Sequence, residues 1–136
     1  MTLDPDRFKG LSSFRSALRR FLAASEAISR QAGVTQQQYQ VLLEIRAADS
    51  GELAMKDLAE QLMLTPHAAV QMIDRLAKAD LARRRASTDD RRVVFVSLTP
   101  RGEELIDELA ASHLDELLRQ EARLRDSLAR LRKLGT

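Results

Sequence analysis

The stretch that decides the fold is Leu81–Gly102, LARRRASTDDRRVVFVSLTPRG. Residues 93–98 are rich in β-branched and aromatic side chains, which favour a strand, and their apolar members alternate onto one face. Residues 81–86 have a weaker strand propensity, and the polar residues 87–92 between the two runs suit a turn. We therefore predict a short β-hairpin with a polar tip.

The predicted hairpin carries an unusual concentration of positive charge. Within ten residues it has two aspartates and five arginines, namely Arg83, Arg84, Arg85, Arg91 and Arg92. The net charge of the whole chain is only +2, so the clustering carries the inference. The opposite charge gathers next to it, because residues 103–116 contain six acidic side chains and no basic one. A cationic hairpin in an otherwise helical chain is typical of a wing that contacts nucleic acid.

Composition sets the outer limits of what the chain can be. Its 136 residues fit one domain, or one domain with an extended dimerising part. The absence of cysteine excludes disulfides, cysteine-ligated zinc and thiol-based sensing within the chain. No apolar run is long enough to span a bilayer and the first ten residues are too polar for a signal peptide, so we expect a cytoplasmic protein.

Two helices are predicted before the helix-turn-helix. Residues 6–32 carry apolar side chains at spacings of three and four, which indicates an amphipathic helix, and Gly33 can end it. Thr35 and Gln38 form a capping-box pattern that begins a second helix, ending near Ala48. A minimal strand is expected at residues 52–53.

The next segment predicts a helix-turn-helix. Residues 55–62 suit a short helix without a good N-cap, since Ala54 stands in that position. Thr65 and Pro66 then suit the N-cap and first position of a second helix that runs to about Ala79. Its inward stripe is predicted to be Ala69, Met72, Ile73 and Leu76.

A long final helix follows the hairpin. Thr99 and Pro100 repeat the capping device of the preceding helix, and the helical pattern runs to about Leu134. The predicted fold class is therefore mainly α with a small β-hairpin wing, a winged helix-turn-helix between long N-terminal and C-terminal helices. We expect the apolar faces of these two long helices, which include three phenylalanines and several leucines, to build a dimer interface.

Two segments resemble the MarR family of bacterial transcription regulators. They are DLAEQLMLTPHAAVQMIDRLAKADLARR at residues 57–84 and DDRRVVFVSLTPRG at residues 89–102. The resemblance covers almost the whole chain and implies an obligate homodimer that binds double-stranded DNA at a palindromic operator, usually as a repressor released by a small ligand. It divides the chain into dimerisation helices at residues 1–34 and 100–136 around a DNA-binding lobe at residues 35–99, all within one intertwined domain.

This sequence departs from the family pattern at two places. Asp80 stands where the family commonly has a glycine before the first wing strand, although aspartate tolerates a positive φ better than most residues. Pro66 and His67 begin the recognition helix where small hydroxyl residues are frequent, which bears on base preference and not on the fold.

In the wing, Arg92 is the leading candidate for a minor-groove contact, because a narrow minor groove has enhanced negative potential. The resemblance implies that Asp90 orients Arg92. The plainer alternative is a solvated surface ion pair. Arg91 could make the groove contact in place of Arg92. Arg84 matches the family's basic residue on the first strand, where it would contact phosphate or support the base of the wing.

The recognition helix supplies a second set of expected DNA contacts. Gln71 can pair with adenine and Arg75 with guanine or phosphate, while Val70 can contact a thymine methyl. Arg75 is equally compatible with an ion pair to Asp90 or another acid. The full expected set on this helix is Thr65, His67, Ala68, Val70, Gln71 and Arg75.

A ligand pocket is implied by the resemblance alone. Arg15, Arg19 and Tyr39 could provide polar contacts to an anionic aromatic ligand, and the alternative is two surface arginines and a core tyrosine. With two isolated histidines and no catalytic constellation, we expect no metal, no cofactor and no enzymatic activity. The alternative function is a protein-interaction winged helix that has lost DNA binding, a reading disfavoured by the arginines of the wing.

Overall fold

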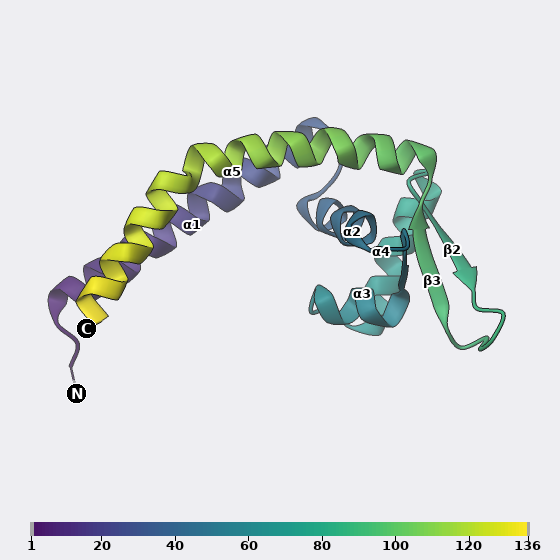
Figure 1. The fold of residues 1–136 in the computed structure, drawn as a ribbon, viewed down its shortest axis with the longest axis horizontal. Coiled ribbons are helices and arrows are strands. Elements are labelled where there is room, and N and C mark those ends of the chain that lie inside the picture. Colours follow the sequence, from purple (N-terminus) through teal and green to yellow (C-terminus); the bar gives the residue numbers. More distant parts are fainter. Residues whose placement is uncertain (1, 136) are drawn as a thin grey trace.

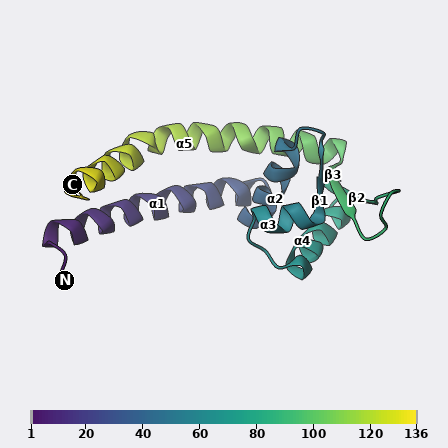
Figure 2. The same cartoon turned by 60° about the horizontal axis from the view of Figure 1, so that its bottom comes forward.

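The computed structural model describes residues 2–135 as a long arm with a compact lobe at one end (Figure 1). The elements in chain order are α1 (Pro5–Gln31), α2 (Gln36–Ala47), β1 (Glu52–Ala54), α3 (Met55–Gln61), α4 (Pro66–Lys78), β2 (Ala82–Ala86), β3 (Val94–Leu98) and α5 (Pro100–Gly135). Helices α1 and α5 run side by side along the arm, and both ends of the chain lie at its far tip (Figures 1 and 2). The predicted fold class is confirmed.

Local sequence signals fix where the helices begin and end. The Thr35 hydroxyl accepts a hydrogen bond from the Gln38 amide and the Gln38 side chain accepts one from the Thr35 amide, so the capping box is formed. Gly33, with φ of +84°, reverses the chain after α1. Helix α3 has no side-chain cap at Ala54, as the sequence predicts. Asp80 takes a φ of 59°, the left-handed conformation in which glycine would be least strained.

The predicted hairpin is part of a three-stranded antiparallel sheet in the order β1-β3-β2. Strand β1 is only three residues long, and it pairs with the middle of β3, from Glu52 opposite Ser97 to Ala54 opposite Phe95. Because β3 lies in the centre, both edges of the sheet are held by one strand. Val96 and Leu98 are buried, which confirms the predicted alternation along β3.

The lobe is built on one hydrophobic core to which α5 also contributes. The stripe predicted for α4 is buried against Leu42, Ile45 and Leu58, and Ile106 of α5 is fully buried in the same cluster. Full burial of a leucine or isoleucine side chain contributes about 1.5–3 kcal/mol. The first turns of α5 therefore belong to the lobe, and the rest of α5 belongs to the arm.

A buried polar cluster joins α1, α2 and α5 where the arm meets the lobe. The rings of His113 and Tyr39 stack with centroids 3.7 Å apart. One imidazole nitrogen of His113 lies 2.8 Å from the carbonyl oxygen of Leu109. Ser29 donates a hydrogen bond to the side chain of Gln36, which in turn donates one to Ser25. These bonds satisfy polar groups whose burial would otherwise be costly.

The side-chain hydroxyl of Thr99 holds the turn between the wing and α5. Thr99 is 2% exposed, and its hydroxyl donates to the carbonyl oxygen of Asp80 at 2.7 Å while it accepts from the amide of Gly102 at 3.0 Å. Gly102 packs so closely against the backbone of Leu81 that a Cβ added to it would lie 2.0 Å from the carbonyl oxygen of Leu81. No side chain fits at that position without moving the backbone.

We therefore predict that Gly102→Ala lowers the free energy of unfolding by about 3 kcal/mol, the upper end of the range for overpacking, because the obstacle is backbone. Urea unfolding would measure this change. Gly10→Ala is the matched control, since its Cβ would meet the flexible ends of the Leu131 and Leu134 side chains, at 2.9 and 3.3 Å, and no backbone. A Gly102→Ala variant as stable as the control would contradict the close packing described here.

Candidate nucleic-acid interface

One face of α4 is packed and the opposite face is free. The buried stripe of α4 fixes the rotation of the helix about its axis, and His67, Gln71 and Arg75 lie exposed on another face. Their spacing of four places them in one row along the helix. The hydroxyl of Thr65 is used as the N-cap, accepting a hydrogen bond from the amide of Ala68 at 3.1 Å. The structure thus brings together the row that the sequence predicts.

The tip of the wing is ordered by its own short-range hydrogen bonds. The Ser87 amide donates to the carbonyl oxygen of Val93 at 2.8 Å, and the Ser87 hydroxyl accepts from the amides of Asp89 and Asp90. The carboxylate of Asp90 accepts from both the amide and the guanidinium of Arg92, at 3.0 and 3.3 Å. The tip therefore presents Arg92 from a fixed turn.

The Asp90–Arg92 pair leaves the arginine accessible. The side chain of Arg92 is 92% exposed, whereas that of Asp90 is 43% exposed. The hydrogen bonds from the Arg92 amide and guanidinium hold the pKa of the Asp90 carboxyl below its ordinary value. Asp90 is consequently ionised at neutral pH and keeps its acceptor oxygens available to orient Arg92.

The other wing arginines are not equivalent. On one face of β2, Arg84 reaches the carboxylate of Asp74 on α4 at 3.2 Å. On the other face, Arg85 pairs with Glu52 of β1. Ion pairs therefore engage Arg84 and Arg85 as well as Arg92. Among residues 2–135, Arg83 and Arg91 are the wing arginines for which no acidic partner lies within ion-pair distance.

These contacts bear on two alternatives that the sequence leaves open. Asp74 pairs with Arg84, and its neighbour Arg75 is exposed on α4. The Arg84–Asp74 pair joins the base of the wing to α4, and a phosphate contact by Arg84 stays a prediction. Glu52 and Asp74, which hold the wing arginines, were not among the predicted site residues. The register of the sheet places Glu52 near β2, and the packing of α4 against β2 places Asp74 there.

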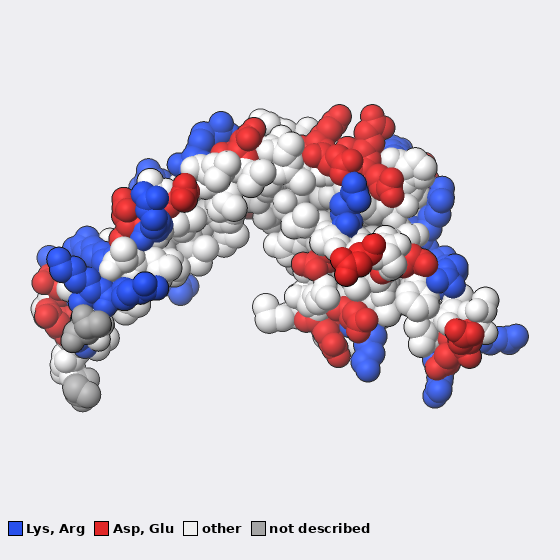
Figure 3. Space-filling view, in the orientation of Figure 1, with Lys and Arg blue, Asp and Glu red and all other residues white. Residues whose placement is uncertain are grey.

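A groove of about 560 Å³ joins the recognition helix to the wing. Its walls include Pro66 and Val70 from α4 together with Arg84 and Arg92 from the wing. The N-terminal half of α4 and the orienting pair at the wing tip therefore lie on the same side of the lobe. This side is separated from the acidic side chains that gather over the first turns of α5 (Figure 3).

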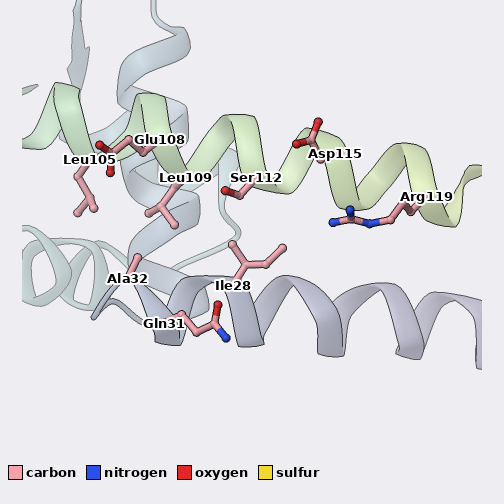
Figure 4. A pocket seen from close by; sticks show the side chains of 9 residues that line it. All are labelled: Ile28, Gln31, Ala32, Leu105, Glu108, Leu109, Ser112, Asp115 and Arg119. Atoms are coloured by element: carbon pink, nitrogen blue, oxygen red, sulfur yellow. The ribbon is translucent and has the colours of Figure 1, made fainter.

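A second cavity lies between the arm helices where they reach the lobe (Figure 4). It has a volume of about 410 Å³, and its lining includes Ile28 and Leu109 together with the charged side chains of Glu108, Asp115 and Arg119. Two carboxylates and one guanidinium give this cavity a net negative lining. Its electrostatics do not favour an anion.

The structure does not bring the three predicted ligand residues together. Arg15 and Arg19 are exposed on α1. Tyr39 is 8% exposed and stacked on His113, and burial raises the pKa of its hydroxyl. None of the three lines either cavity described above. Over residues 2–135 no group of three histidine, aspartate or glutamate side chains is arranged to hold a metal ion, and no helix is long and apolar enough to cross a membrane.

Comparison with known proteins places this geometry in a family. The family model described as "MarR family" matches residues 32–93. The regulator FarR of Neisseria gonorrhoeae, an HTH-type transcriptional regulator, is 32% identical over 133 residues, which cover 92% of this chain and 88% of FarR. Two curated regulators of Bacillus subtilis, YhbI and MdtR, match over 48% and 54% of their own lengths, so the chain spans about half of each.

Solved structures of this family share the fold. AbsC of Streptomyces coelicolor, a MarR family transcriptional regulator, superposes with a TM-score of 0.84 at 24% identity, over 98% of this chain and 91% of AbsC. Because FarR is aligned along nearly its whole length, the relationship extends beyond the helix-turn-helix into both arm helices. The chain therefore belongs to the MarR family of DNA-binding winged-helix transcriptional regulators, and it is not an enzyme.

Proposed function

We propose that this regulator is a cytoplasmic homodimer that represses transcription by binding a palindromic operator through α4 and the wing. The observation that carries the proposal is the shared groove, because Pro66 and Val70 of α4 and Arg92 of the wing line it together, which sets the N-terminal half of α4 and the wing tip on one side of the lobe. A surface of that shape can meet a major groove and the adjacent minor groove at once. In a two-fold dimer the two copies of α4 would enter major grooves about 34–36 Å apart.

The side chains divide into two kinds of contact. Gln71 is proposed to read a base edge, since its amide can pair with adenine, with His67, Ala68 and Val70 beside it on the same helix. Arg75 is proposed to contact guanine or phosphate. In the wing, Arg92 enters the minor groove or contacts phosphate and Asp90 orients it, with Arg91 as the second cation at the tip.

The dimer is proposed from the apolar surface of the arm. Nine of the large hydrophobic side chains that are exposed in the single chain lie in or next to α1 and α5, namely Leu3, Phe8, Leu11, Leu18, Leu22, Leu114, Leu117, Leu118 and Leu128. So many exposed large apolar side chains along one pair of helices are typical of an interface. A cavity between the arm helices near Phe14 is lined by some of the same leucines.

The proposal includes release from DNA by a small ligand. A structural neighbour, NadR, is solved in complex with 4-hydroxyphenylacetate, and its chain is 28% identical with a TM-score of 0.70. MdtR is named as a repressor. We propose an effector that binds beside the arm, with Arg15 and Arg19 as cations for an anionic group. The effector would act through its different affinities for the DNA-competent and incompetent states.

We predict that Arg92→Ala weakens operator binding and lowers the magnitude of the slope of log K against log salt by about one if Arg92 contacts phosphate. Fluorescence anisotropy at several salt concentrations measures both. Arg130→Ala removes a charge at the far end of the arm and is the control. Unchanged affinity for Arg92→Ala at physiological salt would remove the wing from the interface.

For Gln71→Ala we expect a loss of discrimination at one base pair, of about 1–3 kcal/mol, with little change at other positions. Selection of bound sequences from a random pool, compared between the two proteins, measures this. A loss of affinity that is uniform across sequences would show that Gln71 supports binding without reading a base.

Leu118→Glu should convert the dimer to a monomer, because it places a charge on the exposed apolar face of α5. Sedimentation equilibrium would follow the change in mass. Leu43→Glu carries the same substitution on α2, outside the arm, and should remain dimeric. If the unsubstituted protein sediments as a monomer, the proposed dimer does not exist.

A further inference from the structure

We infer that Glu52 and Arg85 are positioning residues that aim the wing at DNA, acting through a side-chain strap across the outer face of the sheet. The inference rests on the proposed function of the wing. It concerns an arginine that charge alone would assign to the DNA contacts.

The strap spans all three strands. Arg85 donates from Nε and from a terminal nitrogen to the two carboxylate oxygens of Glu52, at 3.1 and 3.0 Å. Glu52 lies on β1 and Arg85 on β2, which are the two edges of the sheet. Between them the guanidinium lies 4.9 Å from the ring centroid of Phe95, on the central strand. A bidentate pair stacked on an aromatic ring fixes both the distance and the orientation of the guanidinium.

The backbone alone holds the wing weakly at this point. The third strand of the sheet, β1, pairs with β3 of the hairpin over three residues. Within residues 2–135, β2 pairs along its backbone with β3 alone. The strap ties the free edge of β2 to β1, and the Arg84–Asp74 pair ties the opposite face of β2 to α4. The wing is thus held from both faces.

Arg85 is consequently occupied. Its hydrogen bonds hold the pKa of the Glu52 carboxyl below its ordinary value, so the pair is ionised at neutral pH. In this arrangement Glu52 supports DNA binding although it is itself an anion. If Arg85 were instead a phosphate contact, Glu52 would compete with DNA for the guanidinium. The two roles predict opposite effects of neutralising Glu52.

The test measures operator affinity and its salt dependence for Glu52→Gln, Arg85→Gln and the exchanged pair Glu52→Arg/Arg85→Glu in the full-length protein. As positioning residues, each single substitution should weaken binding about 3- to 10-fold, the size expected when an exposed pair and its ring contact are lost. The salt slope should stay unchanged, and the exchanged pair should recover most of the affinity.

A phosphate contact by Arg85 predicts different results for the same variants. Tighter or unchanged binding by Glu52→Gln, together with a salt slope lowered by about one in Arg85→Gln, would show that Arg85 contacts phosphate and overturn the inference. Arg92→Ala, measured alongside, reports on the wing itself. If Arg92→Ala binds normally, the proposed function of the wing fails; if only the Glu52 and Arg85 variants bind normally, the strap alone is refuted.

Amide hydrogen exchange in the absence of DNA supplies a readout that does not depend on the operator. Faster exchange at Ser87 and Val93, whose amides close the wing tip, is expected in Glu52→Gln. The amides of the α4 core should be unchanged. Equal exchange in the two proteins would mean that the strap does not restrain the wing.

Discussion

The hydroxyl of Thr99 closes the corner on which the rest of the structure depends. It bonds to the carbonyl oxygen of Asp80, where α4 has just ended, and to the amide of Gly102, where α5 begins. The amide of Thr99 also donates to the carbonyl oxygen of Leu81. The recognition helix, the wing and the arm therefore meet within a few residues. Burial makes these bonds important, because each unsatisfied partner would cost about 1–3 kcal/mol.

The fold could be predicted well because its signals are local. Capping residues such as Thr35 and Thr65, the stripe of α4 and the alternation of β3 each act over a few residues, and each is found in the structure. The sequence predicts a minimal strand at residues 52–53, and the structure has a three-residue strand, β1. It depends on a partner more than forty residues away, and nothing within residues 52–54 specifies that pairing.

The site could be predicted only in part, for the same physical reason. The exposed row of α4 follows from helical spacing, and the Asp90–Arg92 pair lies within one turn of chain. The ion-pair partners of Arg84 and Arg85 are acidic residues brought near by tertiary contacts. The two arginines have different partners because adjacent residues on a strand face opposite sides. The number of arginines in a segment does not tell which of them are held in ion pairs and which are available to DNA. Tyr39 illustrates the same limit, because its stacking partner, His113, is far away in the sequence.

Helix α5 has a consequence for how this chain can vary. It runs unbroken for 36 residues, about 54 Å at the usual rise, and one residue, Thr99, separates it from β3. One residue inserted between Thr99 and the exposed leucines of the arm would rotate those leucines by about 100° relative to α4. The number of residues between Thr99 and these leucines therefore sets the angle between the apolar surface of the arm and α4. Substitutions on the outer face of α5 leave this angle unchanged, whereas insertions and deletions change it.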